Sequence, residues 1–322
     1  MDTGDVTSVV EKVIGLVGER YVDPVAAPRI SQVVAAALAA GRYGADERSL
    51  AAAVTSDLQS VNGDKHLRLL YHADPLPERE HGDDAAEWDA MARWAGQTCG
   101  GVAALERRPG NVGYLDIQPV LFPAAISGDA IAAALSLVAP TEALIIDLRR
   151  CIGGEPATAP FLYSYLHGPE PVELTGLYER ATGRVRQFWT LPFVPGRRFG
   201  ATKPVYVLTS GATFSGGEQV SYDLQQTGRA VVIGERTKGG AHAREAFRVH
   251  PHLEATISVA RAVSPVTGGS WEGTGVIPDI EVPAERARDR AYRLALEHVI
   301  TLPGAIAAEA RDALAALAGT AG

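Results

Sequence analysis

The sequence has few of the residues that would indicate a disulfide-rich, metal-binding or membrane protein. Its 322 residues include only two cysteines, Cys99 and Cys151. Two are too few for a disulfide framework, and these lack the close spacing of a metal motif, so we expect unpaired thiols. No apolar run approaches the roughly 18 residues of a membrane-spanning helix. The first residues also lack the basic start and apolar run of a signal peptide. We therefore expect a cytoplasmic chain with no membrane span.

The chain also lacks an excess of positive charge. Lys and Arg total 30 against 38 Asp and Glu, which gives a formal net charge of −8. Binding to nucleic acid through its phosphates requires a clear excess of Lys and Arg, so we expect no nucleic-acid partner. Hydrophobic residues make up 46% of the chain, which is ordinary for a globular protein. A chain of this length fits about two domains.

The apolar pattern changes along the chain. Early valines recur at the i, i+3, i+4 and i+7 spacing of an amphipathic helix. Asp46 is a good N-cap residue for a third helix. The stretch after residue 72 is rich in turn-forming residues, with a short helix expected near 88–94. The predicted division is an N-terminal helical domain at 1–72, a connector at 73–110, a core at 111–300 and a C-terminal helical tail at 301–322.

The core alternates strands with helices. Helical stretches are expected at about 156–167 and 215–227. Strand, helix, strand at this spacing indicates βαβ units and a largely parallel sheet, so the predicted fold class is α/β (α+β). The expected strands are the apolar segments 112–117, 143–148, 204–209 and 230–234.

Two of the expected strand ends carry unusual residues. In a parallel sheet, ligand sites form at the carboxyl ends of the strands. Gly153 and Gly154 follow the second strand, and Ser215 and Gly216 follow the third, at the start of a helix. There Ser215 could attack an acyl carbon while the N–H groups of Gly216 and Gly153 hold the oxyanion. The alternative is that Ser215 is only an N-cap.

A nucleophilic serine needs a base, and the histidines supply candidates. His66 stands in a tight turn before a strand, and His242 stands in a Gly-rich loop after the fourth core strand. Either could approach Ser215. His250 and His252 are expected to alternate along one strand and share a face. They lack a third ligand for zinc, so we predict no metal and no cofactor.

Several short motifs occur together in a fixed order, at residues 21–24, 58–68, 113–115, 146–149, 153–154, 213–218, 228–235, 239–242 and 273–280. In this combination the chain resembles the tail-specific, or C-terminal processing, serine peptidase family. It is most similar to the branch containing bacterial proteins like interphotoreceptor retinoid-binding protein, with tricorn core protease as a more distant relative. The resemblance covers about residues 5–290.

The resemblance implies a crotonase-like ββα core with a small N-terminal helical bundle domain. Many members also carry a PDZ domain between the two, but the connector is too short for one. Familiar members use a Ser–Lys dyad. Aligning their motif at Thr237 places Gly240 where the lysine would stand, so the dyad lysine is absent. We expect the nearby Lys238 to point elsewhere.

The tricorn-like branch instead uses a histidine from the N-terminal part and a glutamate near the end of the core. His66 and Glu272 match these two residues. The resemblance thus implies that Ser215 is the nucleophile, that His66 is the base, and that Glu272 orients the site or stabilises the imidazolium. Lys65 stands where tricorn has a serine. His242 and Lys65 are the alternative bases or cleft residues.

The leading hypothesis is a serine hydrolase, specifically a serine-type peptidase with a Ser-His-Glu constellation. One alternative is a non-catalytic module that binds an apolar, retinoid-like or fatty-acid-like ligand. Another is a small-molecule ester or amide hydrolase, or an acyl transferase, of a specialised pathway. The expected partner is a peptide or a small acyl substrate, and the oligomeric state stays open. Phe188, Trp189, Phe193 and Phe199 lie in a region predicted either to cover the cleft or to pack in the core.

Overall fold

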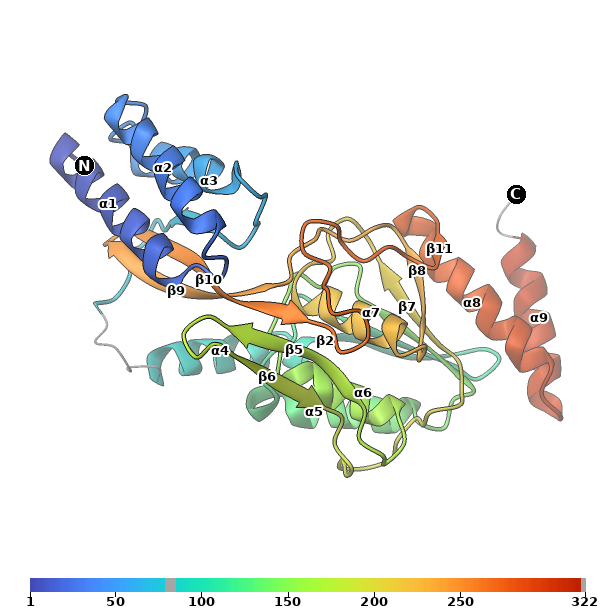
Figure 1. Ribbon diagram of the computed structural model, residues 1–322. Coiled ribbons are helices and arrows are strands. Elements are labelled where there is room, and N and C mark those ends of the chain that lie inside the picture. The colour runs from blue at the N-terminus through green and yellow to red at the C-terminus, as the bar shows by residue number, and fades with distance from the viewer. Residues whose placement is uncertain (79–84, 320–322) are drawn as a thin grey trace.

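The computed structural model describes residues 1–78 and 85–319, and its N-terminal helices form a bundle at one end of the molecule (Figure 1). The helices are α1 (Thr3–Arg20), α2 (Ala26–Ala39) and α3 (Glu47–Gln59). The valine stripe of α1 is buried. As expected, Asp46 caps α3, with its carboxylate accepting a hydrogen bond from the Ser49 backbone at 2.8 Å.

The bundle packs on an antiparallel sheet that contains strands from both ends of the sequence. The strand order is β1 (Arg68–Tyr71), β10 (Leu253–Val263), β5 (Glu173–Glu179) and β6 (Arg184–Trp189), and β9 (His242–His250) also pairs with β10. Leu69, Ala255 and Ile257 share a face of this sheet and join the buried core of the bundle. Figure 1 shows the long β10 running from beneath the bundle toward the rest of the molecule.

A second sheet carries the predicted parallel strands. Its order is β11 (Ile280–Glu281), β8 (Val231–Gly234), β7 (Val205–Thr209), β4 (Ala143–Asp147), β3 (Val112–Ile117) and β2 (Val102–Arg108). In this sheet β3, β4, β7, β8 and β11 run parallel to one another, and β2 is antiparallel to β3. The segment 73–110, which we predicted to be a connector, contains regular structure. It includes α4 (Ala85–Gln97), the short 3₁₀ helix η1 (Cys99–Gly101) and β2.

Helices cover both faces of this second sheet. Alternating strand residues such as Ile146 and Val207 pack with α5 (Ala124–Val138), α6 (Thr158–Leu166) and α7 (Gly216–Gln226). Their neighbours Ile145 and Leu208 pack with α8 (Ala284–Ile300) and α9 (Ala305–Gly319). The alternation follows from the two-residue period of a strand, and burial on both faces explains the continuous apolar runs in the sequence. The mixed helix-and-sheet class is confirmed.

Other expectations have mixed outcomes. Cys99 and Cys151 are both free thiols. Phe199 packs in the core, whereas Phe193 is 78% exposed, and neither lines the large cleft that contains Ser215. The expectation that His250 and His252 share one strand is wrong, because β9 ends at His250 and β10 begins at Leu253. Pro251 explains this break, since it has no N–H to donate to the ladder.

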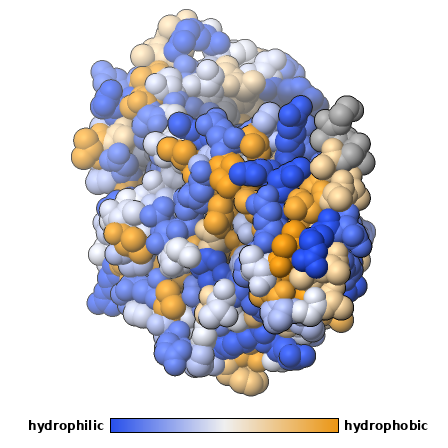
Figure 2. All heavy atoms as spheres, turned by 90° about the vertical axis from the view of Figure 1, so that its right-hand side faces the viewer, coloured by the Kyte–Doolittle hydropathy of each residue, from blue (hydrophilic) through white to orange (hydrophobic). Residues whose placement is uncertain are grey.

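On the face beside α8 and α9, hydrophobic residues lie in small groups between hydrophilic ones (Figure 2). No helix within residues 1–78 and 85–319 has the length and apolar character needed to cross a membrane.

Candidate active site

Three loops at the carboxyl ends of parallel strands converge on one region. They follow β4, β7 and β8, and they contain Gly153, Ser215 and Gly240 respectively. The Phe214 backbone N–H donates to the carbonyl of Cys151 at 3.0 Å, which joins the first two loops. The Lys238 N–H donates to the carbonyl of Thr213, also at 3.0 Å, which joins the second and third. The expected site at this sheet edge is therefore built by backbone contacts between loops.

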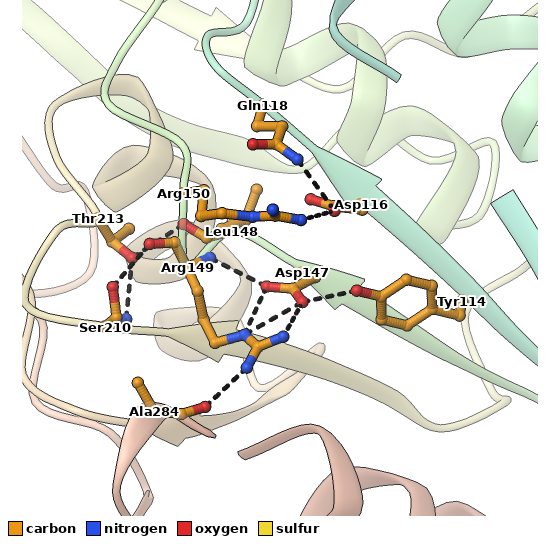
Figure 3. Close-up of polar contacts among 10 residues, drawn as sticks. All are labelled: Tyr114, Asp116, Gln118, Asp147, Leu148, Arg149, Arg150, Ser210, Thr213 and Ala284. Carbon is orange, nitrogen blue, oxygen red and sulfur yellow. Dashed lines mark hydrogen bonds and ion pairs between the residues drawn. The ribbon is translucent and has the colours of Figure 1, made fainter. Parts of the chain in front are cut away.

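A buried charged network supports the loop after β4 (Figure 3). The Asp147 carboxylate accepts from Arg149 at 2.5 Å and from the hydroxyl of Tyr114 at 2.7 Å. Burial raises the pKa of Asp147, but the bonds from Arg149 and Tyr114 outweigh it and leave this pKa below its usual value. Ser210 donates to the Arg149 carbonyl at 2.6 Å, and Thr213 donates to the Leu148 carbonyl at 2.9 Å. These bonds fix the spacing between the two loops.

A second ion pair lies beside the first. Arg150 contacts the Asp116 carboxylate at 2.5 Å, and Gln118 donates to the same oxygen at 3.2 Å. The other carboxylate oxygen of Asp116 is buried and has no partner among the described residues. Burial raises the pKa of Asp116, as does the neighbouring charge of Asp147. Both carboxylates thus anchor arginines of the β4 loop, which makes that loop stiff where it leaves the sheet.

Ser215 adopts a strained backbone at the start of α7. Its φ of +50° and ψ of −114° lie in a region that residues other than glycine rarely enter. The Glu218 carboxylate stabilises this turn by accepting the Ser215 N–H at 2.8 Å. The same carboxylate accepts from the Thr237 hydroxyl at 2.5 Å and from the N–H groups of Gly239 and Gly240 at 2.6 and 2.9 Å. Glu218 therefore couples the Ser215 turn to the loop after β8.

Gly153 and Gly216 lie next to Ser215 and to each other. A Cβ atom on Gly216 would lie 2.9 Å from the Gly153 carbonyl carbon, so only glycine permits this approach. A Cβ on Gly153 would lie 3.7 Å from the Ser215 Oγ. Within residues 1–78 and 85–319, neither glycine N–H donates to a protein acceptor. Two free N–H groups beside a serine hydroxyl are what an oxyanion hole requires.

His66 is held beside the same turn. Its ring stacks on Phe214, with ring centroids 4.6 Å apart and an interplanar angle of 22°. Its backbone is fixed by Asp64, which accepts its N–H at 2.9 Å, and by Thr256, which donates to its carbonyl at 2.6 Å. The residue is 6% exposed, and burial lowers its pKa to about 4. His66 is therefore a neutral imidazole at pH 7 and able to accept a proton.

Among the described residues, Glu272 makes no hydrogen bond or ion pair with His66. The Nδ1 atom of His66 is buried, with no hydrogen-bond partner among the described residues. Glu272 instead accepts the Ala241 N–H at 2.5 Å, and its nearer oxygen lies 4.0 Å from Nδ1 of His242. Burial raises the pKa of Glu272. The resemblance to the tricorn-like branch identified Glu272 as a residue of this region but did not reveal which histidine it approaches.

Asp64 is a site residue that the sequence analysis missed. It is 1% exposed and accepts from Nδ1 of His242 at 2.7 Å and from the Tyr21 hydroxyl at 3.0 Å. Burial raises its pKa, but its bonds, above all that from His242, lower the pKa to about 2. For His242, burial acts in the opposite direction and lowers the pKa. The hydrogen bond and the charge of Asp64 outweigh this effect and raise the pKa of His242 above its usual value. The two form a buried ion pair that joins the bundle, β9 and the His66 turn.

Asp64, His242 and Glu272 form a group of side chains of the kinds that bind metals. One ligand atom of each lies within 4.8 Å of the other two. However, the 2.7 Å separation of Nδ1 and Oδ2 is that of a charge-assisted hydrogen bond. The ion pair already accounts for the short contact, so the arrangement does not call for a metal.

The loop after β8 shows what occupies the position of the missing lysine. A Cβ on Gly240 would lie 2.2 Å from the Phe214 ring and 2.8 Å from the Cε1 atom of His66. No side chain fits at 240 unless both rings move. The ammonium of Lys65 binds the carbonyl of Lys238. The Lys238 ammonium lies 5.1 Å from the centre of the Phe214 ring, and that this lysine points away from Ser215 stays a prediction.

These residues share one large cleft with a volume of about 1590 Å³. Its walls come from the parallel-sheet loops on one side and from β1, β9 and β10 on the other. The lining includes Ser215, Gly153, Gly216, His66, His242 and Lys65. A serine on a strained turn, beside two free N–H groups and a buried neutral histidine, is the arrangement of a serine hydrolase.

Comparisons with known proteins agree with this class. Residues 111–282 match the model of peptidase family S41, and residues 3–94 match the N-terminal domain of peptidase S41 in eukaryotic IRBP. The chain therefore belongs to peptidase family S41, a family of serine peptidases, as the sequence motifs predicted.

Solved structures resemble the whole chain at low identity. A lipoprotein from Streptococcus agalactiae is 14% identical over 89% of this chain and 95% of that chain, with a TM-score of 0.58. The photosystem II D1 C-terminal processing protease is 15% identical over 88% and 94%, with a TM-score of 0.52. Tricorn protease is 13% identical over 98% and 37%, with a TM-score of 0.57. At these identities the likeness shows the fold.

Proposed function

We propose that this S41 peptidase cleaves peptide bonds with Ser215 as the nucleophile, His66 as the base, and the N–H groups of Gly153 and Gly216 as the oxyanion hole. The observation that carries the proposal is the pair of free N–H groups beside a serine held at a positive φ. An N-cap serine alone would need neither the strain nor the second glycine. The alternative of a ligand carrier gives no role to this arrangement.

The reaction proceeds in two balanced halves. In the first, the Ser215 Oγ attacks the carbonyl carbon while His66 takes the hydroxyl proton, and the carbonyl oxygen becomes an oxyanion bound by Gly153 and Gly216. The C–N bond then breaks as His66 passes its proton to the leaving amine. In the second, a water attacks the acyl-enzyme and gives its proton to His66. The acid product leaves, and the proton returns to Ser215.

Glu272 takes a positioning role in this proposal. Its carboxylate accepts the Ala241 N–H and lies 4.0 Å from Nδ1 of His242. It thereby fixes the loop whose Gly240 lies against the ring of His66. We propose that Glu272 keeps this ring in place through the backbone, and that its charge favours the protonated form of His242.

The nucleophile is tested by covalent labelling with a serine-directed phosphonate. Wild type should be labelled, and Ser215→Ala should lose labelling completely and retain at most about 10⁻⁵ of the peptidase rate. Ser60→Ala changes an exposed serine of the bundle and is the matched control, which should label as wild type does. Equal labelling of wild type and Ser215→Ala would refute the assignment.

The base is tested by comparing His66→Gln with His242→Gln. Nδ1 of His242 binds a buried carboxylate, as the base of a triad does, so His242 is the specific rival. We expect His66→Gln to slow phosphonate labelling by at least about 10³-fold, and His242→Gln to slow it much less. The reverse ranking would transfer the role of base to His242.

A further inference from the structure

The cleft is also lined by two arginines, Arg68 and Arg244, that make no ion pair among the described residues. Arg68 on β1 pairs in register with Thr256 of β10, and Arg244 on β9 pairs with Ser258 of β10. Because Thr256 and Ser258 are two residues apart on one strand, both arginines emerge from the same face of the sheet. That face lines the cleft. The opposite face, with Ala255, packs on the bundle.

This arginine pair lies next to the proposed base. The Nε of Arg68 donates to the carbonyl of Lys65, the residue before His66. Thr256, the cross-strand partner of Arg68, donates to the carbonyl of His66 itself. The electrostatic effect of both arginines reaches the imidazole, since each disfavours a positive charge there. A group bound by the pair would therefore lie close to the reacting bond.

Neither arginine has a carboxylate partner among the residues that the structure describes. Burial lowers the pKa of Arg68 and the like charge of Arg244 lowers it further, while the charge of Asp64 offsets part of this decrease. Arg248, on the same strand and face as Arg244, lies 3.6 Å from Glu78 and is thus already paired. Two unpaired arginines on a cleft wall, close enough to repel each other, are stabilised by an anion that binds both.

We infer that Arg68 and Arg244 form an anion subsite that selects substrates with a carboxylate close to the scissile bond. The statement that this subsite selects substrates rests on the proposed function. Binding of an anion by the two arginines does not depend on Ser215. The carboxylate can come from an acidic side chain or from the end of the substrate chain. Both offer the two oxygens that a guanidinium binds with paired hydrogen bonds.

Binding to the uncleaving Ser215→Ala variant tests the inference separately from the chemistry. The probes are fluorescein-labelled hexapeptides of one sequence. Glutamate or glutamine is placed at each position in turn, and each peptide is made with a free or an amidated carboxyl end. We expect fluorescence anisotropy at low salt to show about tenfold tighter binding when one particular carboxylate is present. That carboxylate is either a glutamate at one position, compared with glutamine there, or the free carboxyl end, compared with the amidated end. The glutamate scan and the amidated ends identify its source.

Variants on the same background assign the preference to residues. Arg68→Gln and Arg244→Gln should each reduce the tenfold preference to about twofold, and Arg244→Lys should retain part of it. Arg248→Gln makes the same change in charge on the same strand and should keep the preference. Equal binding of all peptides, no measurable binding of any, or an equal loss in Arg248→Gln would overturn the inference. Phosphonate labelling of wild type reports the proposed function whatever the binding result.

Discussion

The two sides of the active site are each organised by a buried carboxylate, but the carboxylates hold different kinds of partner. Glu218 serves the nucleophile side, where three of its donors are backbone N–H groups and the fourth is a threonine hydroxyl. Asp64 serves the base side, where it holds one backbone N–H, a tyrosine hydroxyl and a histidine. The donors of Glu218 do not titrate near neutral pH, whereas His242 does.

This difference separates two tasks. The Ser215 turn is strained, and its support depends on one titrating group, the Glu218 carboxylate, whose pKa is raised by burial. The His66 turn joins the bundle to the strands around β10, and its support includes an ion pair whose strength follows the protonation of His242. We therefore expect changes at Glu218 to act on stability wherever its carboxylate is ionised, and changes at Asp64 to act within a pH window that also depends on the protonation of His242.

The largest effect is expected for Glu218→Ala. Three buried donors and one half-buried donor would lose their acceptor, and each unsatisfied buried group costs about 1–3 kcal/mol. We expect a loss of at least about 3 kcal/mol in the free energy of unfolding, measured by urea denaturation, together with loss of Ser215 labelling. Glu11→Ala removes an exposed glutamate of α1 and should change stability by less than about 0.5 kcal/mol. If Glu218→Ala left the free energy of unfolding and the labelling of Ser215 unchanged, Glu218 would not support the Ser215 turn.

Asp64→Asn should destabilise by about 2–3 kcal/mol, because it leaves His242 without its buried charge partner. The pKa of Asp64 is lowered to about 2, so its contribution is present above its unfolded value and is lost as pH falls toward 2. The pKa of His242 is raised, so its contribution is present below about 6.5 and is lost as pH rises through the raised value.

The difference between wild type and Asp64→Asn should therefore be greatest between about pH 4 and 6.5 and shrink above that range. Thermal or urea unfolding as a function of pH measures it. Asp129→Asn, at an exposed position on α5, is the control and should show no such window. A pH-independent difference would mean that Asp64 acts only through its hydrogen bonds.

The pH profile of kcat/KM examines His66 directly. Burial lowers its pKa to about 4, so the neutral form persists far below the usual histidine value. With a neutral peptide substrate, we expect the acidic limb of the profile to fall near pH 4, with activity recovered on return to pH 7. Replacing the stacking ring by Phe214→Leu should expose the imidazole and move the limb toward 6.5. A wild-type limb already at 6.5 would contradict the burial argument.

The smallest effect is expected for Glu272→Gln. Its amide oxygen can still accept the Ala241 N–H, and no contact with His66 is lost. We expect kcat to fall less than about tenfold, with a larger fall for Glu272→Ala because that variant also loses the backbone bond. If Glu272→Gln reduced kcat as much as His66→Gln does, Glu272 would act directly on the base.

Sequence patterns predicted the regular elements and the residues with distinctive chemistry. The buried parallel strands and the Ser215 turn are encoded locally, by apolar runs and by a glycine-flanked serine. The Ser215-x-x-Glu218 spacing is also a capping-box pattern and could have identified Glu218. The antiparallel partners β9 and β10, and the burial of Asp64, depend on contacts between distant segments. Short-range patterns do not report such contacts, so the partner of His242 appeared only in three dimensions.

The close packing at Gly240 has an evolutionary consequence. A lysine at this position would have to displace the rings of Phe214 and His66 together. On the assignment that we propose, a lysine at 240 and the ring of His66 in its present place exclude one another, so Gly240→Lys alone does not convert the serine–histidine pair into a serine–lysine dyad. A lineage that changes from one to the other must pass through a sequence that carries neither base in working position, unless residues 66, 214 and 240 change together.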